Sequence, residues 1–139
     1  MGVEVALIEM NKMDLLKQLE EAAKAENWGF VDTHIKEVVG EKEAIDRAKD
    51  LLLNRDPNLR DLGASIFERA KQIDQIARSR LGVLVRSKKP GYDTFRSACA
   101  LAAHDYREIG VKEVLERFKS DPDSEVSSIA EDYLKRVYG

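Results

Sequence analysis

The side chains best suited to nucleophilic or acid–base chemistry are few in this sequence. It contains one cysteine, Cys99, and two histidines, His34 and His104. Cys99 and His104 are five positions apart, a spacing that does not place them on one face of a helix. Because no Cys or His lies at ligand spacing from either histidine, we expect no metal site and no cofactor. Cys99 lies in an apolar pattern and is expected to be a small buried hydrophobe.

Neighbouring carboxylates are a second possible source of chemistry, and Glu20-Glu21 and Glu131-Asp132 are examples. Two acids become catalytic when a cleft shifts their pKa values apart, and no sequence feature here indicates a cleft. The pair His104-Asp105 is adjacent, so its side chains point apart in a helix. The sequence has neither a glycine-rich phosphate loop nor a nucleophile elbow. We therefore expect a protein without enzymatic activity.

Residues 69–96 are the part of the sequence that is most informative about binding. They carry eight basic and two acidic side chains, although the whole chain has a net charge of -3. Such a segment can hold phosphate groups or acidic peptide by charge, and Tyr92 can add stacking. The alternative is a solvated face that pairs with the acidic segments on either side. The basic side chains are Arg69, Lys71, Arg78, Arg80, Arg86, Lys88, Lys89 and Arg96.

The same composition indicates a cellular compartment. A single cysteine excludes an internal disulfide, which is typical of proteins in a reducing cytoplasm. No apolar run approaches the roughly 20 residues of a membrane span. The N-terminus lacks a basic segment followed by an apolar one, so a signal peptide is not expected. We therefore expect a cytoplasmic protein that does not contact a membrane.

The elements that position these groups are predicted to be helices, because apolar residues recur three or four positions apart. Asp56-Pro57 and Asp121-Pro122 mark helix starts, since Asp is a good N-cap and proline suits a first helical turn. Lys89-Pro90 marks another helix start. A break near Lys71 to Asp74 is less clear, so residues 57–88 are either one bent helix or two helices. The repeat described next favours two.

A four-residue step between apolar side chains recurs along the chain with a period of 33 residues. A fixed period of this length indicates a repeat architecture. Each pair can face the interior of a helical hairpin, and stacking of neighbouring hairpins can bury the remaining apolar side chains. The pairs are Leu15 and Leu19, Ala48 and Leu52, Leu81 and Val85, and Val114 and Phe118.

A second pattern defines the units. The triplet Leu62, Ile66 and Ala70 returns 33 residues later, and a third version begins at Val126. Residues spaced in this way share one helix face. We predict one all-α domain over residues 1–139, with about eight helices in four antiparallel hairpins. Within it, residues 40–139 form three regular repeats, residues 10–39 form an irregular first hairpin, and residues 1–9 are either an arm or the first turns of a long helix.

The best unit resembles a short HEAT repeat. It consists of residues 109–118, the turn Asp121 to Val126, and then Ala130 and Leu134; residues 40–70 follow the same order. The resemblance implies a HEAT-like, right-handed α-solenoid in which the second helix of each hairpin lines the concave face. It also implies a function in protein–protein interaction or scaffolding.

In this family a basic residue often follows the apolar residue that opens the second helix of a repeat. Here Arg96 follows Phe95 in this way, but Gly63 follows Leu62. The main competing solenoid is the tetratricopeptide array, with a period of about 34 residues. Leu62-Gly63 resembles its pattern, but its small and aromatic positions do not recur in the other units.

We therefore expect a non-enzymatic module that binds a protein partner of unknown identity. The alternative is binding of nucleic acid or another polyanion through residues 69–96, which the acidic balance of the whole chain makes less expected. A homodimer through the apolar residues Val3, Val5, Leu7 and Ile8 is a third possibility. The candidate partner-binding residues are Arg60, Arg69, Arg78, Arg86, Lys88, Lys89, Tyr92, Arg96 and Arg107.

Overall fold

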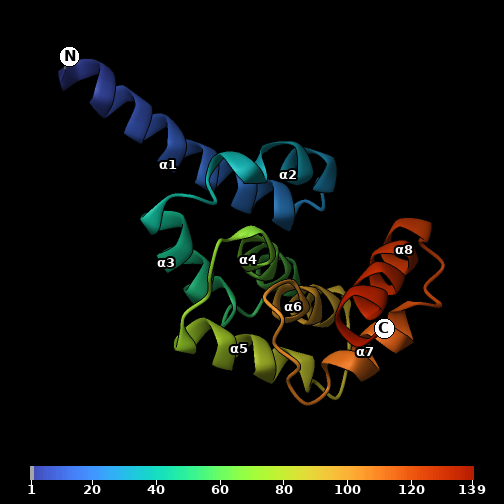
Figure 1. Cartoon of the computed structure of the whole chain (residues 1–139). Coiled ribbons are helices and arrows are strands. Elements are labelled where there is room, and N and C mark those ends of the chain that lie inside the picture. The colour runs from blue at the N-terminus through green and yellow to red at the C-terminus, as the bar shows by residue number, and fades with distance from the viewer. Residues whose placement is uncertain (1) are drawn as a thin grey trace.

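The computed structural model describes the backbone of residues 2–139 and the side chains of residues 12–139. This part of the chain is all helical, as predicted, with eight α-helices and no strand (Figure 1). The helices are α1 (Gly2–Lys24), α2 (Trp28–His34), α3 (Lys42–Leu51), α4 (Pro57–Arg69), α5 (Gln75–Val85), α6 (Tyr92–Ala103), α7 (Val111–Phe118) and α8 (Ser124–Tyr133). A 3-10 turn, η1 (Ile35–Glu37), follows α2, and a π-helical turn, η2 (Leu134–Tyr138), follows α8.

Aspartate caps begin three helices of the regular part, α4, α5 and α8. The Asp56 carboxylate accepts a hydrogen bond of 2.8 Å from the backbone N–H of Asn58 at the start of α4. Asp74 caps α5 in the same way through the N–H of Ala77, also at 2.8 Å. The weakly marked break between residues 71 and 74 therefore separates two helices, as the repeat predicts. Since a cap satisfies backbone donors that have no partner within the helix, these aspartates fix where α4 and α5 begin.

Helices α4 and α6 pack against each other and form the centre of the molecule, and α3, α5 and α7 follow one another along one side of them (Figure 1). The repeat explains this packing. Leu62 and Ile66 of α4, and Phe95 and Cys99 of α6, are almost completely buried. Burial of a large apolar side chain contributes about 1.5–3 kcal/mol, so the two triplets are a main source of stability.

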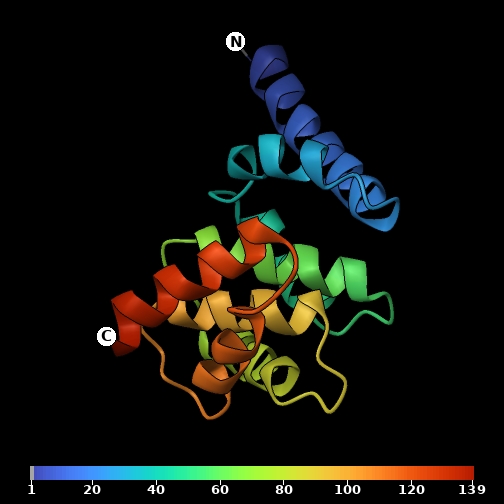
Figure 2. The ribbon, with the colours of Figure 1, turned by 90° about the vertical axis from the view of Figure 1, so that its right-hand side faces the viewer.

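The first hairpin packs differently from the later ones. Helix α1, and not the second helix of that hairpin, packs against α4, while α2 packs against α1. Leu19 and Ala23 of α1 are fully buried, as is Val31 of α2. Figure 2 shows α1 and α2 on one side of the remaining helices. Trp28, the first residue of α2, is half-buried against the core.

The first residues of the chain belong to a helix, because α1 begins at Gly2. Of the two alternatives for residues 1–9, the first turns of a long helix is therefore the one observed for residues 2–9. The residues that could form a homodimer, Val3, Val5, Leu7 and Ile8, lie outside the described side chains, so this possibility stays a prediction. None of the described helices combines the length and the apolar composition needed to cross a lipid bilayer.

Candidate functional site

A groove of about 410 Å³ opens between α4, α6 and the C-terminal end of α8. Three helices from three successive repeats supply its walls, and they are the second helices of their hairpins. We call this depression the arginine groove, because three guanidinium groups line it. Its lining residues are Glu68, Arg69, Arg96, Ile129, Asp132, Tyr133 and Arg136.

Glu68 is the centre of the polar contacts in the arginine groove. Its Oε1 accepts a hydrogen bond of 3.0 Å from the guanidinium of Arg96. Its Oε2 accepts one of 2.6 Å from the hydroxyl of Tyr133. The guanidinium of Arg69 lies 3.6 Å from Oε1. Glu68 thus joins α4, α6 and α8, and both of its oxygens are occupied by groups of this chain.

Arg96 also faces a second buried carboxylate. Its Nε lies 3.8 Å from Oδ1 of Asp61, too far for a hydrogen bond, and this buried Nε has no partner among the described residues. The hydroxyl of Ser65 donates a hydrogen bond of 3.2 Å to Asp61. Burial raises the pKa of Asp61 to about 7, although the nearby Arg96 charge acts in the opposite direction. Arg96 is therefore paired mainly with Glu68.

Burial also determines the state of Cys99. Its side chain is 0% exposed, so the predicted buried hydrophobe is confirmed. Burial, together with the Glu68 carboxylate, raises the pKa of the thiol well above its usual value. A protonated and inaccessible thiol is a poor nucleophile. The Asp61, Arg96 and Cys99 side chains therefore serve as interior contacts between helices, and the accessible chemistry of the groove lies at its mouth.

The mouth of the arginine groove combines positive charge with an aromatic surface. The guanidinium of Arg136 lies 4.8 Å from the centre of the Tyr133 ring, a cation–π contact. Arg69 and Arg136 are exposed, whereas Ile129 and Tyr133 are half-buried. Asp132, also exposed, contributes a negative charge on the same side. This arrangement suits a ligand that offers both carboxylates and an apolar group.

Several predicted site residues have structural partners instead. Arg60 forms an ion pair of 2.9 Å with Asp93, 33 positions later, and donates a hydrogen bond of 2.8 Å to the carbonyl of Asn54. Arg78 pairs with Glu108 and lies 3.9 Å from the centre of the Tyr106 ring. These two arginines connect successive repeats, and their charges are largely balanced.

The remaining predicted site residues lie on other parts of the surface. Arg86, Lys88 and Lys89 are exposed at the end of α5 and in the turn that follows. Tyr92 is also exposed, but its hydroxyl donates a hydrogen bond of 3.1 Å to Asp121. Arg107 is exposed in the loop after α6. Among the predicted residues, the arginine groove brings together only Arg69 and Arg96.

Sequence reasoning missed the residues that complete the arginine groove: Glu68, Ile129, Asp132, Tyr133 and Arg136. Tyr133, the last residue of α8, donates its hydroxyl hydrogen bond to Glu68. The sequence holds one signal for it. If Val126 is aligned with Leu62, Tyr133 takes the position of Arg69, next to Glu68.

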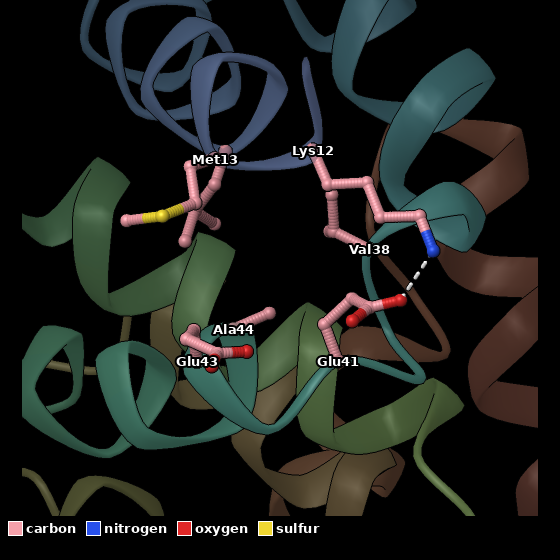
Figure 3. Close-up of a pocket in the computed structure, with 7 residues that line it drawn as sticks. Lys12, Met13, Val38, Glu41, Glu43 and Ala44 are labelled. Carbon is pink, nitrogen blue, oxygen red and sulfur yellow. Dashed lines mark hydrogen bonds and ion pairs between the residues drawn. The ribbon is translucent and has the colours of Figure 1, made fainter. Parts of the chain in front are cut away.

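A smaller pocket of about 220 Å³ lies between α1 and α3 (Figure 3). Leu16, Val38 and Ala44 give it an apolar lining, and the ammonium of Lys12 lies 2.5 Å from the Glu41 carboxylate at its edge. This ion pair connects α1 to the start of α3. The pocket therefore belongs to the junction between the first hairpin and the regular repeats.

No group of three or more His, Cys, Asp or Glu side chains within residues 12–139 is arranged to hold a metal ion. Comparisons of this chain with protein families, with curated proteins and with solved structures found no match.

Proposed function

We propose that this chain is a HEAT-like, right-handed α-solenoid that binds a protein partner without catalysing a reaction. The 33-residue period and the packing of α4 against α6 support the solenoid arrangement. The partner is proposed to occupy the arginine groove, on the face formed by the second helices of the three repeats. The single buried cysteine supports a cytoplasmic location.

The observation that carries this proposal is the composition of the groove mouth. Arg69, Arg136 and Tyr133 come from separate helices and meet around one depression. Arginine and tyrosine are the residue types that most often dominate binding energy at protein interfaces. Because Glu68 already occupies Arg96 and the Tyr133 hydroxyl, the outer guanidinium groups of Arg69 and Arg136 are the ones that a partner carboxylate would meet.

The burial of the reactive groups supports a binding function over an enzymatic one. Asp61 has a shifted pKa, which is often a sign of an active site. However, the side chains of Asp61 and Cys99 are both buried, so they offer a substrate little accessible surface. Burial is the main cause of both pKa shifts.

A second candidate function is binding of nucleic acid or another polyanion through residues 69–96. It is favoured by Arg86, Lys88 and Lys89, which are exposed and form no ion pair within residues 12–139. Such binding would weaken steeply as salt is added, because phosphate contacts release counterions. A gel-shift experiment at low salt that shows no retarded complex would remove this candidate.

The proposed function is tested by isolating partners from a lysate of the source cells with the immobilised protein. We expect a specific partner to bind the wild type and to be lost with the double variant Arg69→Glu/Arg136→Glu. The control is Lys88→Glu/Lys89→Glu, which changes the net charge equally at a distant turn and should retain the partner. Equal loss with both variants, or no partner for the wild type, would contradict the proposal.

A further inference from the structure

A larger depression of about 610 Å³ lies where the loop between η1 and α3 meets the turn between α4 and α5. Its lining differs from that of the arginine groove, because four cationic side chains surround an apolar floor. The cations are Lys36, Lys42, Arg69 and Lys71, and Val39 and Ile45 belong to the floor. We call this depression the lysine groove.

The charge of the lysine groove is incompletely balanced. Its described lining includes no carboxylate. Lys36 and Lys71 are exposed and form no ion pair within residues 12–139. The ammonium of Lys42 lies 3.1 Å from the Asp46 carboxylate, and the guanidinium of Arg69 lies 3.6 Å from the Glu68 carboxylate. The positive charges of Lys42 and Arg69 are therefore partly neutralised within the chain. A negatively charged ligand would therefore meet at least two cations that have no competing partner.

The floor of the lysine groove indicates the kind of anion. Val39 and Ile45 are half-buried and leave part of their apolar surface open to the groove. No aromatic side chain is among its described lining residues, and single-stranded nucleic acids are commonly held by stacking on aromatic rings. An apolar floor between cations suits instead an apolar side chain flanked by carboxylates. This is the chemistry of an acidic peptide.

The two grooves meet at one residue. Arg69, the last residue of α4, lines both the arginine groove and the lysine groove. A single extended segment can therefore pass from one depression to the other at the end of α4. The same guanidinium can contact carboxylates on either side of this crossing.

We infer that the lysine groove docks an acidic peptide segment of the partner, with carboxylates on its cations and an apolar side chain on Val39 and Ile45. This inference rests on the proposed function, since it names the chemistry of the protein that this module would bind. It adds a second contact region, which includes Lys36 and Lys42 from outside the basic segment 69–96.

The test uses the whole protein and the fluorescence anisotropy of a short labelled peptide of alternating glutamate and leucine. We expect saturable binding that weakens with added salt, and little binding of the same peptide with glutamine in place of glutamate. Lys36→Gln/Lys71→Gln should weaken binding by about tenfold, because two exposed ion pairs of up to about 1 kcal/mol each are lost. Lys88→Gln/Lys89→Gln carries the same charge change and should bind as the wild type does.

Other occupants give different results in this experiment. A thymidine oligonucleotide that displaces the peptide and loses affinity with Lys36→Gln/Lys71→Gln would assign the groove to nucleic acid and overturn the inference. A dimer of the free protein, seen by light scattering, that the peptide dissociates and that Lys36→Gln/Lys71→Gln abolishes would assign the groove to a second copy of the chain and overturn the inference. Absence of binding, or equal weakening by both double variants, would also overturn it.

A further variant separates this inference from the proposed function. Arg136→Gln alters the arginine groove alone, so it should leave peptide affinity unchanged and weaken capture of the partner from lysate. Peptide binding without any captured partner would contradict the proposed function but not the lysine groove. Capture that survives Lys36→Gln/Lys71→Gln, together with absence of peptide binding, would contradict the lysine groove alone.

Discussion

The hydroxyl of Tyr133 donates a hydrogen bond of 2.6 Å to Oε2 of Glu68, although the two residues are 65 positions apart. This bond connects the last turn of α8 to the last turn of α4. Arg96 of α6 binds the other carboxylate oxygen of Glu68 at 3.0 Å. One carboxylate therefore holds three repeats together at the base of the arginine groove.

Replacing Tyr133 with phenylalanine should destabilise the protein. The change removes one hydrogen bond to a charged and half-buried acceptor and leaves the ring in place, so we expect a loss of roughly 1.5–2 kcal/mol in the free energy of unfolding. Urea denaturation followed by circular dichroism measures it. Tyr92→Phe is the matched control, since its hydroxyl bonds to Asp121 at the surface, and its loss should be below about 1 kcal/mol. Equal losses for Tyr133→Phe and Tyr92→Phe would show that burial of Glu68 does not strengthen its hydrogen bond with Tyr133.

Asp61 should make stability depend on pH. Its pKa is about 7 in the folded protein, mainly because of burial, against an ordinary value of 3.8. When the pH lies between these two pKa values, Asp61 keeps its proton in the folded chain but has released it in the unfolded chain. This contribution to stability is therefore complete below about pH 4 and is lost as the pH rises through about 7.

The variant Asp61→Asn, which cannot ionise, isolates this effect. From pH 5 to pH 8 the wild type should lose roughly 2–3 kcal/mol relative to the variant, at about 1.4 kcal/mol for each unit of pKa shift. Urea denaturation at several pH values gives the comparison. For the control Asp132→Asn, which replaces an exposed aspartate, the free energy of unfolding should change with pH as it does in the wild type. If that of Asp61→Asn also changes as in the wild type, Asp61 is ionised in the folded protein over this range.

Gly63 allows α4 to approach α3 closely. A Cβ at this position would lie 2.9 Å from the carbonyl oxygen of Ala48 and 3.1 Å from the Cβ of Leu51. The steric clash in Gly63→Ala should therefore lower the free energy of unfolding by about 1–3 kcal/mol. The higher helix propensity of alanine offsets up to about 1 kcal/mol of this loss. Thermal unfolding measures the change. Gly40→Ala, where nothing lies within 4 Å of the added atom, should shift the free energy of unfolding by less than about 1 kcal/mol.

The sequence predicted the helices well because their signals are local. Asp56 caps α4 where predicted, and Gly110, with a φ of 97°, precedes α7. The start predicted at Asp121-Pro122 lies two residues later, because Asp123 and not Asp121 caps α8. The period also predicted that equivalent residues would be buried in successive units, as Leu62 and Phe95 are. Each of these inferences depends on neighbours within one hairpin or on the repeat itself.

The arginine groove was harder to predict, because it depends on how successive helices are rotated. One residue corresponds to about 100° around a helix, so a small register change moves a side chain to another face. The contact between Glu68 and Tyr133 joins positions two repeats apart, and the shorter spacing of the last repeat, 31 residues, shifts their alignment. The lysine groove likewise joins Lys36 to Lys71 across the irregular first hairpin, where the period gives no guidance.

The most direct test of the arginine groove as a partner-binding surface is photo-crosslinking in the source cells. A photoreactive phenylalanine analogue replaces either Ile129, which lines the groove, or Ile109, which is 84% exposed in the loop before α7. We predict that the protein with the analogue at position 129 forms a discrete covalent adduct with another protein, and that the one with the analogue at position 109 does not. An adduct from position 109 alone, or from neither position, would contradict the proposed function.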